Sequence, residues 1–142
     1  MPYNPEVVAP MRAELVRLGA EELLSSADVD AALAEASGTA LLVVNSVCGC
    51  AAANARPAVA IATGHEAQPE KILTVFAGQD LEATERAREF MVGYRPSSPS
   101  IGLFRDGEHV FMLERHEIEG RDATEIAEDL KQAYDRYCGS DG

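Results

Sequence analysis

The sequence predicts an α/β fold, a central mixed sheet of four strands flanked by helices. Two short, almost continuous apolar runs, 40–46 and 71–77, are rich in branched residues and are typical of buried strands. The stretch 100–115 contains Asp106 followed by Gly107, the strongest short signal for a β-hairpin turn. A helical pattern separates the two apolar runs, so a βαβ unit precedes the hairpin and one further helix follows it.

Two helices are expected before the first strand. The first has Pro10 in its first turn, where proline is tolerated, and ends at Gly19. The second begins at Ser25, and Asp28 three residues later resembles a capping box. Gly38 is expected to end this helix, because glycine readily adopts the left-handed conformation of a C-terminal cap.

The remaining helices are expected after the first strand, after the second strand and at the end of the chain. Pro57 lies inside the first of these, 51–63, and would kink it or cost about 3 kcal/mol in a straight helix. Asp80 is placed to cap the helix that follows the second strand. Asp122 and Glu125 are spaced as a capping box and begin the last helix.

Composition limits the classes of protein and partner. With 142 residues, 46% of them hydrophobic, a single domain over 1–142 with a usable core is expected. The formal net charge of −12 and the dispersed basic residues argue against a nucleic-acid partner. The sequence shows neither a secretory signal nor an apolar run of the roughly 20 residues that cross a bilayer, so we expect a cytoplasmic protein with no membrane partner. In that compartment paired cysteines are more often catalytic or metal-binding than structural.

Cys48 and Cys50 stand one residue apart, just past the end of the first predicted strand. A helix is expected to begin there, and its N-terminal N–H groups and partial positive charge stabilise a thiolate. Cys48 precedes the helix and is the better nucleophile, whereas Cys50 lies further in and suits a resolving role. Gly49 can adopt the unusual dihedral angles that a disulfide across one residue demands. The pair therefore predicts thiol–disulfide exchange.

Two other interpretations of the pair remain open. Buried cysteines can simply fill space at a strand–helix junction. Zinc usually takes four protein ligands, or three and a water molecule, and Cys48 and Cys50 supply two. His65 lies at the far end of the intervening helix, so a third ligand would have to come through space, from His116 or Cys138. No metal site is therefore expected.

The segment before the hairpin carries the second informative motif. Ser98 and Pro99 directly precede the predicted strand, where a cis bond would mark a constrained turn. A C-x-C pair at a strand–helix junction, followed by proline before an antiparallel hairpin, resembles the thioredoxin-like arrangement. There a cis-proline loop packs against the active-site cysteines and offers backbone groups to the substrate. The resemblance implies a substrate-binding site that includes Gly49, Ser98 and Pro99.

Four blocks in order, "NSVCGCAAANARPA", "TVFAGQD", "PSSPS" and "RHEIEG", make the resemblance more specific. Together they resemble the bacilliredoxin family, thioredoxin-like proteins with a C-G-C motif, over nearly the whole chain including the N-terminal helices. The family reduces mixed disulfides between protein cysteines and bacillithiol, a low-molecular-weight thiol. The resemblance implies that Cys48 attacks the mixed disulfide and that Cys50 then closes a disulfide with it. Free bacillithiol or a reductase would reset the pair.

The partners implied by the resemblance are S-thiolated client proteins, with bacillithiol as thiol co-substrate and no bound cofactor. Two alternatives use the same residues. One is a disulfide isomerase or oxidant, and the other is a non-enzymatic metal-binding or thiol-sensing module.

Four more residues have weaker expectations. Arg56 follows Cys48 by about two helical turns, and Asn54 lies nearer to the pair. Either could touch a thiolate or a bound thiol, although a solvated helix surface is commoner. His116 could serve as an acid–base group or lie on the surface. Cys138 is expected to be an exposed thiol in the tail, open to modification or to an intermolecular disulfide.

Overall fold

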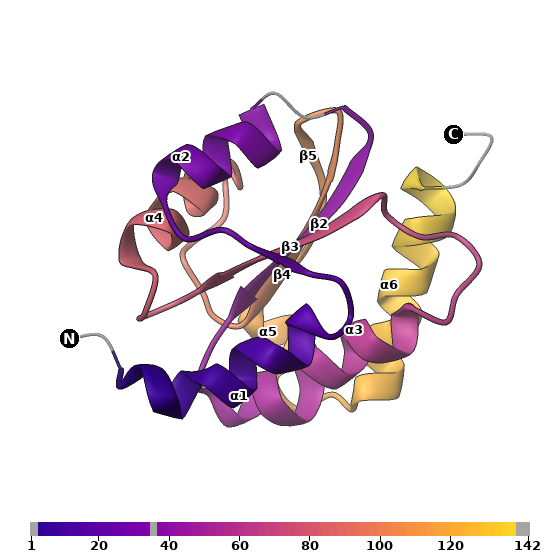
Figure 1. Cartoon of the computed structure of the whole chain (residues 1–142). Coiled ribbons are helices and arrows are strands. Elements are labelled where there is room, and N and C mark those ends of the chain that lie inside the picture. The colour runs from indigo at the N-terminus through magenta and orange to yellow at the C-terminus, as the bar shows by residue number, and fades with distance from the viewer. Residues whose placement is uncertain (1–2, 35–36, 139–142) are drawn as a thin grey trace.

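A computed structural model describes residues 3–34 and 37–138. Its sheet has five strands in the order β1-β3-β2-β4-β5, and Figure 1 shows helices on both faces of it. β1, β3 and β2 run parallel, whereas β4 is antiparallel to β2 and to β5. The strands are β1 (Glu21–Glu22), β2 (Thr39–Asn45), β3 (Lys71–Phe76), β4 (Ser100–Arg105) and β5 (Glu108–Leu113).

The four strands predicted from the sequence are all present. The expectation of a four-stranded sheet is wrong, because the sheet has a fifth strand. The extra strand, β1, pairs Glu21 with Leu73 and Glu22 with Thr74 at the sheet edge. Two glutamates have no apolar alternation, so local sequence gives no strand signal there. The backbone becomes a strand because β3 offers it a free edge, and the charged side chains suit that exposed position.

The helices are α1 (Pro5–Val16), α2 (Ser26–Val29), α3 (Arg56–Ala62), α4 (Leu81–Glu89), α5 (Arg115–Ile118) and α6 (Ala123–Tyr137). Wider π-type turns at Asp30–Ala34 and Ala51–Ala55 extend α2 and precede α3. α3 packs against α6 and α1 on one face of the sheet, and α2 packs against α4 on the other (Figure 1). No helix in the described residues is both long and apolar enough to cross a bilayer.

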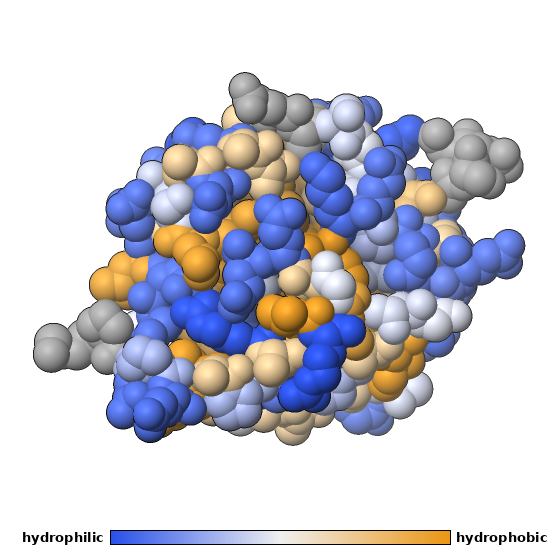
Figure 2. Space-filling view, in the orientation of Figure 1, coloured by the Kyte–Doolittle hydropathy of each residue, from blue (hydrophilic) through white to orange (hydrophobic). Residues whose placement is uncertain are grey.

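β2 is the centre of the fold because it is buried along its whole length. Successive side chains of a strand point to opposite faces, so Leu41 and Val43 enter the core beneath α3 and α6. Leu42 and Val44 enter the second core, beneath α2 and α4. The continuous apolar run of β2 therefore serves two cores, and its end is fixed in position. On the face shown in Figure 2, hydrophilic residues predominate and hydrophobic residues appear in patches between them.

The expected first helix begins earlier than predicted, at Pro5, and Pro10 lies inside it. Asn4 is its cap, and the Asn4 side chain accepts a hydrogen bond from Glu6 N at 2.9 Å. Pro5 in the first turn is the proline that the helix N-terminus favours. Pro10 only removes one hydrogen bond from an exposed side of the helix.

The second helix begins as predicted, with the Ser25 hydroxyl accepting from Asp28 N at 3.1 Å. Its described part ends in the π-type turn at Ala34, and the stretch between that turn and Gly38 includes residues outside the described ranges. Gly38 has φ +83° and donates its N–H to Asp106 Oδ1 at 2.7 Å, so it directs the chain into β2.

Pro57 does not break the predicted helix over 51–63, because the turn before it widens. Arg56 N donates to Ala51 O, the i to i−5 bond of a π-type turn, and Pro57 then occupies the first turn of α3. This is a position where the missing N–H of proline costs little. The expected kink is therefore replaced by a local change of helical pitch.

The remaining turn and cap predictions have mixed outcomes. The hairpin turn is confirmed, with positive φ at Asp106 (+51°) and Gly107 (+80°). The capping box of Asp122 and Glu125 at the start of α6 is confirmed. Asp80 stands at the N-cap position of α4, yet its carboxylate makes no capping bond. It accepts two charge-assisted hydrogen bonds from the Arg12 guanidinium and one from Phe76 N at 3.2 Å instead, so the carboxylate is turned towards β3 and α1.

Candidate active site

Cys48 lies where the sequence predicts it, after β2 and directly before the next helix. Its carbonyl accepts the first helical hydrogen bonds, from Ala51 N at 3.0 Å and Ala52 N at 3.3 Å. Cys48 N donates to Ser46 Oγ at 2.9 Å, which holds the loop back towards the strand. Because β2 is anchored in both cores, the position of Cys48 follows from the end of that strand.

The two sulfur atoms of the pair are 3.2 Å apart, and both cysteines are free thiols. The pKa of Cys48 is lowered, first by a hydrogen bond from the Cys50 thiol and then by Cys50 N, which lies 3.4 Å from Cys48 Sγ. The pKa of Cys50 is raised, first because its proton is shared with Cys48 and then by burial. The negative charge of the ionised pair therefore resides on Cys48.

Two residues at the ends of α5 contribute charge to the pair. Arg115 is the first residue of the helix. Its positive charge lowers the pKa of Cys48, and this effect is smaller than that of the hydrogen bonds from Cys50. Glu119 directly follows the helix, and its Oε2 lies 3.1 Å from Arg115 Nε and 3.5 Å from Cys50 Sγ. Neither residue is predicted as part of the site from the sequence, although both lie in the "RHEIEG" block.

The Ser98–Pro99 bond is cis, as expected. Pro99 is buried and Ser98 is half-buried at the start of β4. Arg115 Nη1 donates to Ser98 O at 3.3 Å, so one arginine contacts the proline loop and acts on the Cys48 thiolate. Gly49 is exposed, and a Cβ at that position would meet nothing within 4 Å. The surface over the pair is therefore open.

Arg56 is neither a contact of the thiolate nor a solvated helix residue, so both of its expected roles are wrong. Its side chain is 3% exposed and donates to Asn45 Oδ1 at 2.8 Å and to Ser46 O at 3.1 Å. Arg56 Nε also lies 3.1 Å from Glu14 Oε2 of α1. The guanidinium thus ties α3 and α1 to the loop that leads to Cys48. Sequence periodicity cannot predict this, because the acceptors come from outside the helix.

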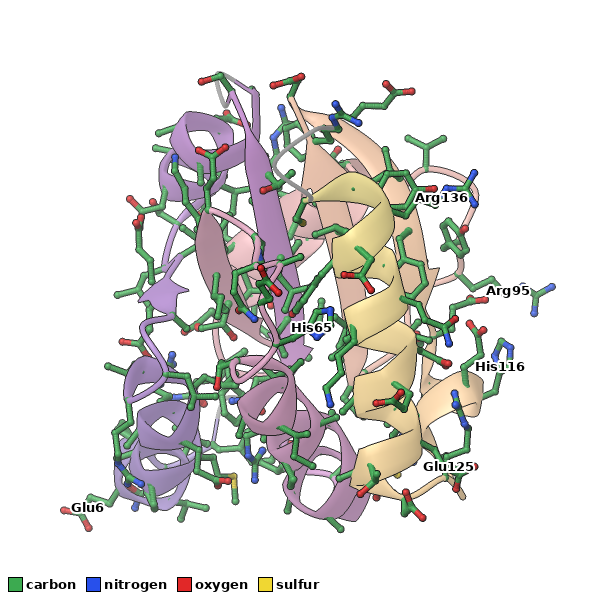
Figure 3. The ribbon with its side chains drawn as sticks, turned by 90° about the vertical axis from the view of Figure 1, so that its right-hand side faces the viewer. Glu6, His65, Arg95, His116, Glu125 and Arg136 are labelled. Carbon is green, nitrogen blue, oxygen red and sulfur yellow. The ribbon has the colours of Figure 1, made fainter. Side chains whose placement is uncertain are left out.

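Among the described residues, no hydrogen bond joins Asn54, His65 or His116 to the sulfur atoms of the pair. Asn54 donates its side-chain N–H to the Arg121 carbonyl. His65 pairs with Asp135 at 2.8 Å. His116 is exposed and projects outwards from α5 (Figure 3).

A metal site at the cysteine pair would need a third ligand close by. Among residues 3–34 and 37–138, the one group of three metal-ligating side chains within 4.8 Å is Glu114, His116 and Glu117. It contains neither Cys48 nor Cys50. Glu117 Oε1 already accepts from Glu114 N at 3.0 Å, so this group has a role in starting α5.

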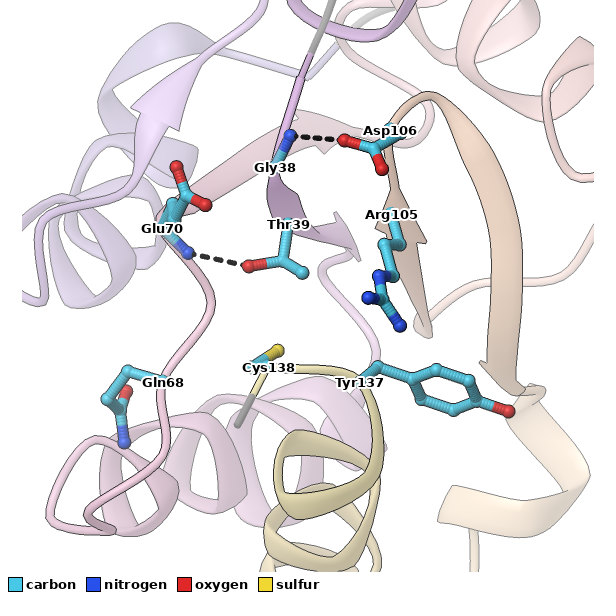
Figure 4. A pocket seen from close by; sticks show the side chains of 8 residues that line it. All are labelled: Gly38, Thr39, Gln68, Glu70, Arg105, Asp106, Tyr137 and Cys138. Atoms are coloured by element: carbon cyan, nitrogen blue, oxygen red, sulfur yellow. Dashed lines mark hydrogen bonds between the residues drawn. The ribbon is translucent and has the colours of Figure 1, made fainter. Parts of the chain in front are cut away.

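Cys138 is half-buried, which corrects the expectation of an exposed tail thiol. It borders a polar pocket of about 210 Å³ (Figure 4), together with Thr39 at the start of β2. Burial raises the pKa of Cys138. Cys48 follows the last residue of β2, whereas Cys138 lies beside the first. Cys138 and the cysteine pair are therefore at opposite ends of this strand.

Comparison with known proteins adds to this geometry. A family model described as disulphide isomerase matches residues 3–138. A bacilliredoxin of Salinibacter ruber is 58% identical over 99% of this chain and 84% of its own length. Bacilliredoxins of Koribacter versatilis (97% of this chain and 95% of the relative) and Staphylococcus epidermidis (96% and 93%) are 51% and 48% identical.

Solved thioredoxin structures are similar in fold. The thioredoxin of Fasciola hepatica matches with a TM-score of 0.55 and 18% identity, over 82% of this chain and 98% of its own. The thioredoxin of Malassezia sympodialis matches with a TM-score of 0.56 and 16% identity, over 84% and 90%. The thioredoxin-like fold expected from the sequence is confirmed. At these identities the likeness concerns the fold alone.

Proposed function

Because the chain belongs to the bacilliredoxin family, whose members reduce bacillithiol mixed disulfides on proteins, we propose that Cys48 is its nucleophile and Cys50 its resolving cysteine. The observation that carries this assignment is the geometry of the two sulfur atoms. At 3.2 Å, the Cys50 thiol can donate to the Cys48 thiolate, and Cys50 N donates to the same sulfur. Both bonds stabilise the ionised form of Cys48, which is the form that attacks a disulfide.

The reaction proceeds in two exchanges. The Cys48 thiolate attacks the bacillithiol sulfur of the mixed disulfide, a new S–S bond forms, and the client leaves as a reduced thiol. Cys50, once deprotonated, attacks Cys48 Sγ, and bacillithiol leaves as its thiolate. The two electrons needed to reduce the client come from the pair, which ends as the Cys48–Cys50 disulfide. Two further thiols, from bacillithiol or a reductase, return it to the dithiol.

The substrate lies between the pair and the proline loop in this proposal. Gly49 keeps the approach to Cys48 free of side chains, since it is exposed and has no neighbour within 4 Å of a Cβ position. Ser98 and Pro99 offer backbone groups to the bound polypeptide. Arg115 contacts Ser98 O and acts on the Cys48 charge, so it can hold the loop beside the thiolate. A resting dithiol needs a reducing compartment, and we place the reaction in the cytoplasm.

Mass spectrometry of trapped adducts tests the roles of the cysteines. A client peptide carrying bacillithiol on one cysteine is incubated with the wild type, Cys48→Ala and Cys50→Ala. We expect an internal disulfide in the wild type, one bacillithiol adduct on Cys48 in Cys50→Ala, and unreacted protein in Cys48→Ala. Cys138→Ala is the matched control and should behave as the wild type, because Cys138 lies at the opposite end of β2 from the pair. A Cys48→Ala protein that releases the peptide at the wild-type rate overturns the proposal.

Disulfide isomerisation is a second candidate, favoured by the description of the matching family model. An isomerase needs a nucleophile that forms and releases mixed disulfides without net oxidation. Scrambled ribonuclease separates the two activities. Cys50→Ala should retain isomerisation and lose catalytic reduction if the chain does both. Loss of both activities in Cys50→Ala rejects isomerisation by Cys48 alone.

A further inference from the structure

The resolving step needs an acceptor for the Cys50 proton, because the thiolate is the attacking species. In the reduced protein this proton faces two acceptors, Cys48 Sγ at 3.2 Å and Glu119 Oε2 at 3.5 Å. The first disappears when Cys48 is bonded to bacillithiol, because a disulfide sulfur carries no negative charge. Among the described residues, Glu119 is then the charged acceptor that remains in contact with Cys50.

We propose that Glu119 is a catalytic residue that accepts the Cys50 proton in the resolving step, an inference that rests on the proposed roles of Cys48 and Cys50. The Glu119 carboxylate takes the proton as Cys50 Sγ attacks Cys48 Sγ. The Cys48–Cys50 bond forms, and the bond from Cys48 to bacillithiol breaks. The electron pair of the broken bond leaves on the bacillithiol sulfur. Glu119 then passes its proton to that thiolate or to water and is ionised again.

Arg115 keeps Glu119 in place for this role. The guanidinium Nε lies 3.1 Å from Glu119 Oε2, the same oxygen that faces Cys50. This contact, together with the Cys50 hydrogen bond, holds the pKa of Glu119 below its ordinary range, so the carboxylate is ionised at neutral pH. Glu119 is 56% exposed, and its effect belongs at the low end of general-base catalysis.

A base would speed the resolving step, whereas a negative charge alone would slow it. This difference makes the inference testable. Among the described residues, the charged and titratable groups that face Cys50 are Cys48 on its own loop, Arg115 at the start of α5 and Glu119 directly after it. The negative charge of Glu119 raises the pKa of Cys50. If that were its whole effect, Glu119→Gln would increase the fraction of Cys50 thiolate and speed resolution. If Glu119 is the base, the same change slows it.

The experiment follows both exchanges in one trace. One equivalent of 5,5′-dithiobis(2-nitrobenzoate) is mixed with the full chain carrying Cys138→Ser, so that only the pair reacts. Attack by Cys48 releases the first thionitrobenzoate, and attack by Cys50 releases the second. The variants are Glu119→Gln, Glu119→Asp and the control Glu85→Gln. Glu85 is an exposed carboxylate on α4, so its substitution makes the same charge change outside the site.

We expect Glu119→Gln to slow the second phase about tenfold or more at pH 7, with the first phase changed by less than about twofold. The wild-type second phase should be nearly independent of pH from 5.5 to 8.5. The Glu119→Gln second phase should rise about tenfold per pH unit, because free Cys50 thiolate must then form by itself. Glu119→Asp should lie between the two, and Glu85→Gln should match the wild type.

Each other outcome has a definite meaning. A second phase in Glu119→Gln that is unchanged or faster overturns the role as a base. Equal slowing of both phases overturns it too, because a general disturbance of the site would do this. Cys48→Ala keeps only the Cys50 thiol of the pair, so we expect one slow release of thionitrobenzoate and no second release. A release in Cys48→Ala as fast as the wild-type first phase would overturn the proposed nucleophile, on which the inference about Glu119 rests, and this outcome is distinct from those that test Glu119.

Discussion

Replacement of Arg56 by methionine should destabilise the protein more than any surface change. The guanidinium is 3% exposed and contacts two parts of the chain, the end of β2 and α1. It donates to Asn45 Oδ1 at 2.8 Å and to Ser46 O at 3.1 Å, and its Nε lies 3.1 Å from Glu14 Oε2. Methionine fills a similar volume, so the loss comes from the hydrogen bonds and not from a cavity.

The magnitude follows from these contacts. A hydrogen bond to a charged group contributes about 1.5–3 kcal/mol, and Arg56 makes two to acceptors that stay buried. The ion pair adds at most about 1 kcal/mol, because Glu14 is 42% exposed and is screened by water. We therefore expect a loss of about 3–7 kcal/mol in the free energy of unfolding. For a chain of this length the Tm should fall by about 10–25 °C.

Thermal and urea unfolding of the reduced protein, followed by circular dichroism, measure this loss. Arg95→Met is the matched control, since Arg95 is exposed and projects outwards before β4 (Figure 3). Arg56→Lys keeps the charge but loses the planar fork, and should lie between the wild type and Arg56→Met. A fall in Tm of less than about 3 °C in Arg56→Met would refute the view that this arginine holds the loop before Cys48.

Two further predictions concern the thiolate and the last helix. Arg115→Gln should raise the pKa of Cys48, because the lowered pKa depends in part on that cation. Alkylation of Cys48 by iodoacetamide should then slow about two- to fivefold at pH 7. The effect is small because Arg115 is 45% exposed. The two alkylation rates should converge once the pH exceeds the pKa of Cys48 in both the wild type and the variant. Equal rates at pH 7 would exclude Arg115 from thiolate stabilisation. Asp122→Ala removes the cap that accepts from Glu125 N at 2.9 Å, and urea unfolding should show a loss of about 1 kcal/mol. An unchanged midpoint would mean that water replaces this cap without cost.

Local patterns predicted most of the fold because the contacts that stabilise them lie within a few residues. The hairpin turn needs positive φ at Asp106 and Gly107, residue types that tolerate that conformation. The start of α6 needs a side-chain acceptor at Asp122. The same patterns failed for β1, whose only strand signal is the free edge of β3. They also failed for Pro10, because Asn4 and Pro5 form an earlier and better helix start.

The sequence by itself determined the chemistry of this protein. Cys48 and Cys50, the helix that follows them and the proline before the hairpin are all local features, and together with the family resemblance they led to thiol–disulfide exchange. Only the tertiary structure decided which groups surround the sulfur atoms. Glu119 lies 69 residues after Cys50, and the contact exists because α5 packs beside the loop that follows β2. Side-chain periodicity describes one element at a time, whereas a proton acceptor or a buried arginine is defined by what a second element brings to it.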